Sequence, residues 1–80
     1  DDKMKIKVYT LPTCGYCKMT REFLRDKDID FEEFNVEENY KFANEMVAKS
    51  GQRGTPVIDV DGVIIVGFNK NKIKEVLNIK

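Results

Sequence analysis

The residues best suited to chemistry are two cysteines, Cys14 and Cys17, which are separated by Gly15 and Tyr16. They are the only cysteines among 80 residues, and the chain has no histidine. Two thiols at this spacing can attack a disulfide in turn, the first forming a mixed disulfide that the second resolves. Without histidine, Cys–His and Ser–His pairs are excluded, and two cysteines cannot complete a four-ligand zinc site. The pair therefore predicts thiol–disulfide exchange, with no bound cofactor or metal.

The elements around the pair favour this interpretation. Residues 5–9 alternate charged and apolar side chains, which predicts a strand, and apolar positions recur at helical spacing over residues 16–28. Cys14 would then stand at a helix start, where backbone N–H groups and the helix dipole lower the pKa of a thiol below about 8.5. Cys17, one turn later, returns to the same face. We therefore expect a nucleophilic Cys14 and a resolving Cys17. The alternative roles for the two cysteines are as ordinary buried small residues or as part of a metal-binding knuckle.

The rest of the chain supplies the remaining elements of an α/β domain. Asp61-Gly62 separates two β-branched runs, which is a strong hairpin signal. The further predicted elements are a strand at residues 30–35, a helix at 40–49, strands at 57–60 and 63–66, and a last helix capped by Asn69. This β-α-β-α-β-β-α order predicts a thioredoxin-like fold, with one mixed four-stranded sheet flanked by helices.

The large apolar side chains outside the cysteine motif are assigned to packing rather than to ligand contacts. One hydrophobic core has to be built from them in a chain of this length. The residues assigned in this way are Phe23, Phe31, Phe34, Tyr40 and Phe42, together with Met19 and Met46.

A second candidate site feature is Thr55-Pro56, which directly precedes the hairpin. A proline that leads a strand is ordinary at a sheet edge. A cis bond before Pro56 would instead turn the Thr55 backbone toward Cys14. The N–H and C=O groups of Thr55 would then be free to pair with an extended substrate.

Composition narrows the classes of partner. The 14 basic and 14 acidic residues cancel, so no net field draws the chain to nucleic acid or to acidic membranes. No apolar run reaches the roughly 18 residues of a membrane span. We expect a cytoplasmic monomer with one domain at residues 4–80, and residues 1–3 resemble the remnant of a protease-recognition tag.

Four short motifs together resemble the glutaredoxins and glutaredoxin-like redoxins over residues 4–80. They are residues 13–17 (TCGYC), 52–57 (QRGTPV), 61–62 (DG) and 66–68 (VGF). The resemblance implies the thioredoxin-like fold, a nucleophilic Cys14, a resolving Cys17 and a cis-Pro56. It implies further substrate contacts, which fall on Tyr16, Arg53, Thr55, Gly67 and Phe68. The implied substrates are disulfide-containing proteins or small disulfides.

The resemblance leaves two electron donors open. Glutathione-using members often carry two glycines and an acidic residue after the last strand, where this chain has Val66 and Lys70. Lysine cannot accept a hydrogen bond from the glutathione ammonium, although Arg53 could still pair with a glutathione carboxylate. The VGFN run at residues 66–69 is more similar to redoxins that serve ribonucleotide reductase and take electrons from a flavoprotein reductase.

Gly15 also allows a different class of function, that of an iron–sulfur cluster carrier. Glutaredoxins with glycine after the first cysteine can resemble carriers in which two chains and two glutathiones hold a [2Fe–2S] cluster. Cys14 would then be the protein ligand, since thiolates suit such clusters. A non-catalytic interaction module is the third alternative.

Overall fold

The computed structural model describes residues 5–79, so the predicted tag remnant lies outside the described residues. The predicted order β-α-β-α-β-β-α is confirmed, with shifts of one or two residues at several boundaries. The elements are β1 (Ile6–Thr10), α1 (Gly15–Asp26), β2 (Glu32–Asn35), α2 (Tyr40–Ser50), β3 (Val57–Val60), β4 (Val63–Val66) and α3 (Lys70–Leu77).

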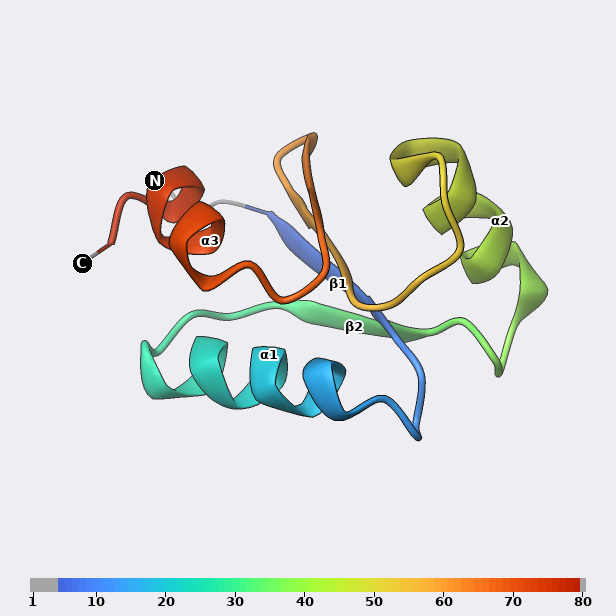
Figure 1. Cartoon of the computed structure of the whole chain (residues 1–80), viewed down its shortest axis with the longest axis horizontal. Helices are drawn as coiled ribbons and strands as arrows, with labels where there is room; N and C mark the ends of the chain where they lie inside the picture. Colours follow the sequence, from blue (N-terminus) through green and yellow to red (C-terminus); the bar gives the residue numbers. More distant parts are fainter. Residues whose placement is uncertain (1–4, 80) are drawn as a thin grey trace.

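The strands form one mixed sheet in the order β2-β1-β3-β4 (Figure 1). β1 runs parallel to β2, so α1 serves as the crossover between them. β3 is antiparallel to both β1 and β4. The β3–β4 hairpin turns at Asp61 and Gly62, whose φ angles of 49° and 94° are the positive values that a tight hairpin turn requires.

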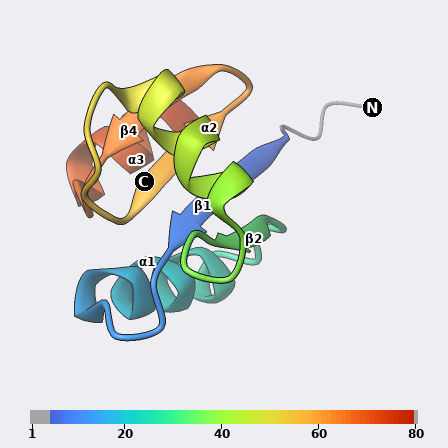
Figure 2. The ribbon, with the colours of Figure 1, turned by 90° about the vertical axis from the view of Figure 1, so that its right-hand side faces the viewer.

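The sheet separates two packed layers. Because side chains alternate along a strand, Val8 and Ile58 pack with α1 and α3, while Tyr9 and Val57 pack with α2. Figure 2 shows α2 lying in front of β1, with α3 behind the hairpin. Within residues 5–79, no helix is both long enough and apolar enough to cross a membrane.

Two of the residues assigned to packing are in fact exposed. Tyr40 is 73% exposed and Met19 is 47% exposed, whereas Met46 is buried. Tyr40 is the first residue of α2 and lies outside the stripe, through Phe42 and Met46, that packs on the sheet. Hydrophobicity predicts burial on average, but the position on the helix decides which apolar residue faces water.

A polar cluster fastens α2 to the sheet. Lys49 Nζ donates to Asp59 Oδ2 at 2.7 Å and to the Tyr9 hydroxyl at 2.8 Å. The Tyr9 hydroxyl donates in turn to Glu45. Asp59 Oδ1 accepts the backbone N–H of Gly62 at 2.7 Å. Burial of the Tyr9 and Asp59 side chains is tolerated because both are hydrogen-bonded.

Candidate active site

Cys14 occupies the N-cap position of α1. Its backbone is extended, with φ −87° and ψ 113°, and its N–H donates to the Leu11 carbonyl at 3.2 Å. The sulfur accepts the backbone N–H of Cys17 at 3.1 Å, which is the hydrogen bond that a serine or aspartate oxygen makes in an ordinary N-cap. A thiolate at this atom therefore replaces a cap oxygen and meets the positive end of the helix dipole.

This environment favours the charged form of Cys14. Partial burial alone would raise its pKa, but hydrogen bonds with the Cys17 and Thr55 side chains outweigh that effect. The backbone N–H groups of Cys17 and Tyr16 act in the same direction, so the pKa of Cys14 lies below its ordinary value. A lower pKa raises the thiolate fraction near neutral pH, and the thiolate is the reactive form.

Cys17 has the opposite environment. It is fully buried, and burial together with the hydrogen bond to Cys14 raises its pKa to about 11. Both cysteines are free thiols in the structure. The site thus pairs the half-buried Cys14 sulfur, which ionises readily, with the buried Cys17 sulfur, which stays protonated.

Alkylation should distinguish the two sulfurs. The pKa of Cys17 is about 11, while that of Cys14 lies below the ordinary cysteine value. At pH 7 the thiolate fraction of Cys17 is therefore smaller than that of Cys14 by a factor of at least about 100. We expect brief iodoacetamide treatment at pH 7 to label Cys14 alone, as read by peptide mass spectrometry. The labelling rate should rise with pH and level off above the pKa of Cys14. Equal labelling of both cysteines would contradict this assignment.

The loop before β3 lies against the cysteine pair. The Thr55–Pro56 peptide bond is cis, as the resemblance implies. The Cys14 thiol donates to the Thr55 carbonyl at 3.7 Å, which brings two segments 41 residues apart into contact. The Gly67 N–H donates to the Pro56 carbonyl at 2.8 Å and so ties the end of β4 to the same loop.

A side-chain clamp shapes this loop, and sequence reasoning missed it. The Gln52 amide donates to the Gly54 carbonyl at 3.0 Å and accepts the Gly54 N–H at 2.6 Å. Ser50 Oγ donates to the Gln52 carbonyl at 3.0 Å. A Cβ at Gly54 would come within 2.8 Å of Gln52 Oε1, so glycine fits the clamp. Gln52 satisfies both backbone groups of the residue directly before Thr55.

Removing the clamp should loosen the loop. We expect Gln52→Ala to slow the reduction of a peptide disulfide by about three- to tenfold, because Thr55 is then held less firmly beside Cys14. The reaction with iodoacetamide should change less than twofold, since that reagent needs no loop contact. Stopped-flow rates with the two reagents provide the measurement, and Gln52→Glu, which keeps only the acceptor, should fall between. An equal loss with both reagents would show a general effect on Cys14 instead.

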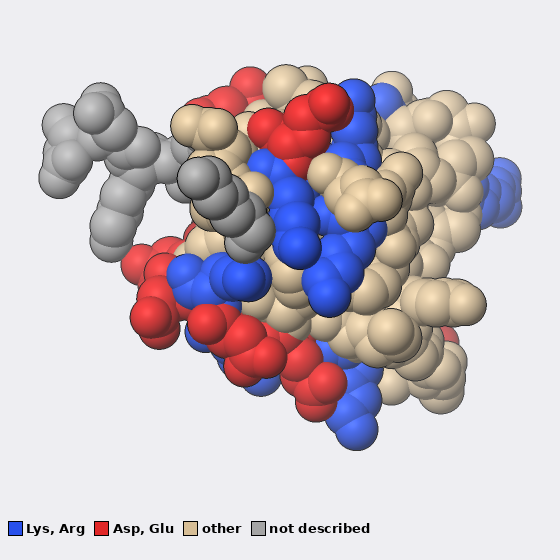
Figure 3. All heavy atoms as spheres, turned by 60° about the vertical axis from the view of Figure 1, so that its left-hand side comes forward, with Lys and Arg blue, Asp and Glu red and all other residues tan. Residues whose placement is uncertain are grey.

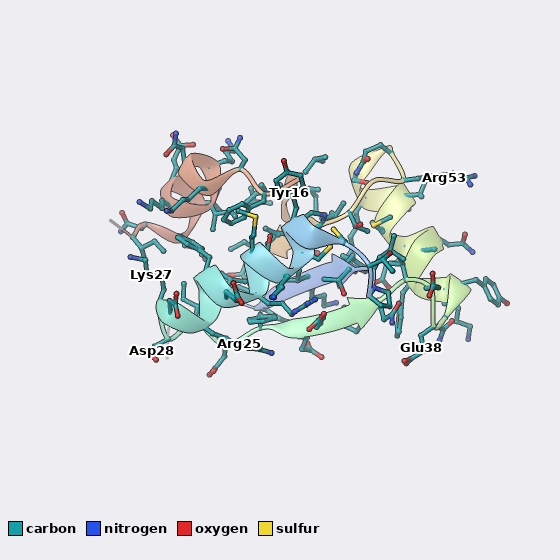
Figure 4. All side chains as sticks on the ribbon, turned by 60° about the horizontal axis from the view of Figure 1, so that its bottom comes forward. Tyr16, Arg25, Lys27, Asp28, Glu38 and Arg53 are labelled. Carbon is teal, nitrogen blue, oxygen red and sulfur yellow. The ribbon has the colours of Figure 1, made fainter. Side chains whose placement is uncertain are left out.

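The other predicted site residues differ in their distance from Cys14 and in their exposure. Tyr16 is 64% exposed beside Cys14. Phe68 packs edge-on against Phe23, with ring centroids 6.0 Å apart, so much of its surface serves the core. Arg53 is exposed and lines a cavity of about 230 Å³ that α2 residues also line, and Figure 4 shows it well to the side of Tyr16. The structure thus gathers Tyr16, Thr55 and Pro56 around Cys14, while Arg53 lies apart.

Taken together, the fold and the site define a class of protein. A cysteine pair opens α1, a cis-proline loop lies against it, and a mixed four-stranded sheet carries both. The reduced pair can donate two electrons to a disulfide and become a disulfide itself. The protein is a thiol–disulfide oxidoreductase with a thioredoxin-like fold.

The chain belongs to the glutaredoxin family, whose family model matches residues 6–65. It is 50% identical over 72 residues to an uncharacterized glutaredoxin-like 8.6 kDa protein in the rubredoxin operon of Clostridium pasteurianum, covering 90% of this chain and 96% of that protein. The crystal structure of the thioredoxin-like protein BC3987 superposes with a TM-score of 0.85 at 32% identity, covering 90% of this chain and 99% of that chain. The NrdH-redoxin of Escherichia coli, a glutaredoxin-like protein with a thioredoxin-like activity profile, gives 0.79 at 29% identity, covering 90% and 93%.

Proposed function

We propose that the protein reduces disulfides in other proteins through Cys14 and Cys17. The Cys14 thiolate attacks one substrate sulfur, and the other substrate sulfur leaves as a thiolate that takes up a proton. Cys17, after losing its proton, attacks the Cys14 sulfur and releases the second substrate thiol. The substrate disulfide gains two electrons, and Cys14–Cys17 becomes a disulfide. The observation that carries this proposal is the position of the Cys14 sulfur at the start of α1, where it accepts a hydrogen bond from the Cys17 N–H.

We further propose that a flavoprotein disulfide reductase, rather than glutathione, restores the dithiol. Lys70 stands about where glutathione-using relatives place an acid, and its Nζ lies 5.7 Å from the centroid of the Phe23 ring. An ammonium there repels the glutathione ammonium. Val66, in place of a glycine, is half-exposed and adds bulk beside the site. The thioredoxin-like activity profile of the similar NrdH-redoxin supports the same donor. We also propose a cytoplasmic location, because the cytosol keeps thiols reduced. We further propose that the protein acts as a monomer.

Two donors tested in parallel provide the experiment. Oxidised protein is incubated either with NADPH and a thioredoxin-type flavoprotein reductase or with glutathione, NADPH and glutathione reductase. We expect NADPH consumption at least about tenfold faster with the flavoprotein, since a misplaced charge in a binding site costs a kcal/mol or more. Faster turnover with glutathione would overturn the donor assignment. It would also favour the [2Fe–2S] alternative, which needs glutathione sulfurs as ligands and can be read from visible absorption after anaerobic reconstitution.

A further inference from the structure

Two lysines, one at the C-terminal end of α1 and one at the start of α3, lie over the same aromatic ring, and a third lysine follows on α3. Lys27 Nζ and Lys70 Nζ lie 5.9 Å and 5.7 Å from the centroid of the same ring, that of Phe23. Lys74 follows Lys70 by one turn of α3, on the same side of that helix. Figure 3 shows basic side chains on this side of the molecule, with acidic side chains above and below them. We call Lys27, Lys70 and Lys74 the lysine cluster.

Lys70 is unfavourably placed in the isolated protein. Lys70 stands in the first turn of α3, which contains no acidic residue, so its charge opposes the helix dipole. Lys70 and Lys74 repel each other at the i, i+4 spacing. Neither has an ion-pair partner among residues 5–79. Local conflicts of this kind are expected at functional surfaces, and negative charge brought by a partner would relieve this one.

Exposed apolar side chains connect the cluster to the reactive sulfur. Tyr16 and Met19 are 64% and 47% exposed, and they share one stripe of α1 with Phe23 at helical spacing. From Cys14 to Phe23 the helix rises about 14 Å, which is the reach of roughly four residues of extended chain. A bound segment could therefore place its cysteine at Cys14 and its fourth or fifth neighbour at the lysine cluster.

We propose that this surface selects protein substrates by an acidic segment next to the reactive cysteine. The inference rests on the proposed function and names the substrate class of the same site. The preferred segment is extended, with an apolar residue beside the cysteine that packs on Tyr16 and Met19. Its carboxylates, about four or five residues from the cysteine, lie against Lys70 and Lys74. Lysine ammonium groups suit this task because they attract carboxylates as point charges and carry flexible stems.

Two matched peptides test the proposal. Each carries one cysteine as a mixed disulfide with thionitrobenzoate and a leucine beside it, and positions four and five beyond the cysteine hold either Glu-Glu or Gln-Gln. The Cys14 thiolate attacks the peptide sulfur and releases the coloured thionitrobenzoate. Cys17 then closes the protein disulfide and frees the peptide thiol. At 20 mM NaCl we expect the Glu peptide to react about tenfold faster, falling to within about twofold at 500 mM because salt screens exposed charges.

Variants assign the preference to the cluster. Lys70→Gln combined with Lys74→Gln should remove most of the advantage of the Glu peptide and bring the two peptides to within about twofold of each other at low salt. Lys41→Gln is the matched control, because Lys41 is exposed on α2, which packs on the other face of the sheet. The proposal is overturned if the wild-type protein shows no salt-sensitive preference, or if the double variant keeps it. No release of thionitrobenzoate from either peptide would instead contradict the redox function itself.

Discussion

Cys14→Ser is expected to abolish disulfide reduction, with a loss of more than about 1,000-fold, because a serine hydroxyl is not ionised at neutral pH and cannot replace the thiolate. Cys17→Ser should behave differently, since Cys14 can still attack but nothing resolves the product. The variant should accumulate as a mixed disulfide with its protein substrate, and any glutathione-dependent monothiol reaction should survive. Reduction of insulin disulfides measures the first effect, and non-reducing gels with mass spectrometry measure the second.

The fold should survive both substitutions, so a loss of activity can be assigned to chemistry. A serine oxygen at position 14 can accept the Cys17 N–H that the sulfur accepts at 3.1 Å, and serine is a favourable N-cap. Circular dichroism and thermal unfolding of the variants provide the control. Disulfide turnover that persists in Cys14→Ser would show that the reactive sulfur has been assigned wrongly.

Lys49→Met is expected to lower the free energy of unfolding by about 2–3 kcal/mol, because it leaves the buried Asp59 carboxylate without its partner. The Tyr9 hydroxyl loses a hydrogen bond in the same step. The expected loss is smaller than that for a fully buried pair, since the Lys49 side chain is 26% exposed. Urea unfolding followed by tyrosine fluorescence gives the measurement.

An exposed pair supplies the matched control for this substitution. Lys72 lies 3.5 Å from Glu75, whose side chain is 74% exposed, so Lys72→Met should change stability by less than about 0.5 kcal/mol. Equal losses in the two variants would show that the cluster on α2 has no special role. An unchanged midpoint in Lys49→Met would contradict the expected contribution directly.

The same cluster predicts how stability depends on pH. Burial alone would raise the pKa of Asp59, but the Lys49 ammonium and the Gly62 N–H outweigh it and hold that pKa below its usual value. Its contribution is therefore present above about pH 4, the unfolded pKa, and is lost as pH falls through the folded pKa. Burial alone would lower the pKa of Lys49, but its bonds to Asp59 and Tyr9 raise it. That contribution is present below about pH 10 and is lost at higher pH.

Features encoded over short stretches of chain could be predicted from the sequence. The helix start at Cys14 follows from Pro12 and from the apolar spacing after it, and the hairpin follows from Asp61-Gly62. The spacing of Cys14 and Cys17 determined the class of chemistry, because an i, i+3 relation on one helix turn fixes the geometry of both sulfurs. Each of these signals lies within a few residues of the feature that it predicts.

Only the tertiary structure decided which distant segments meet. The hydrogen bond of Lys49 to Tyr9 joins residues 40 positions apart, and it depends on strand register, which sequence periodicity does not give. The approach of Lys70 to Phe23 likewise depends on how α3 packs beside α1. Periodicity indicates that a residue lies on an apolar stripe but not which element covers the stripe or where the cover ends. For that physical reason the exposure of Met19 and the basic surface beyond it emerge only in the folded chain.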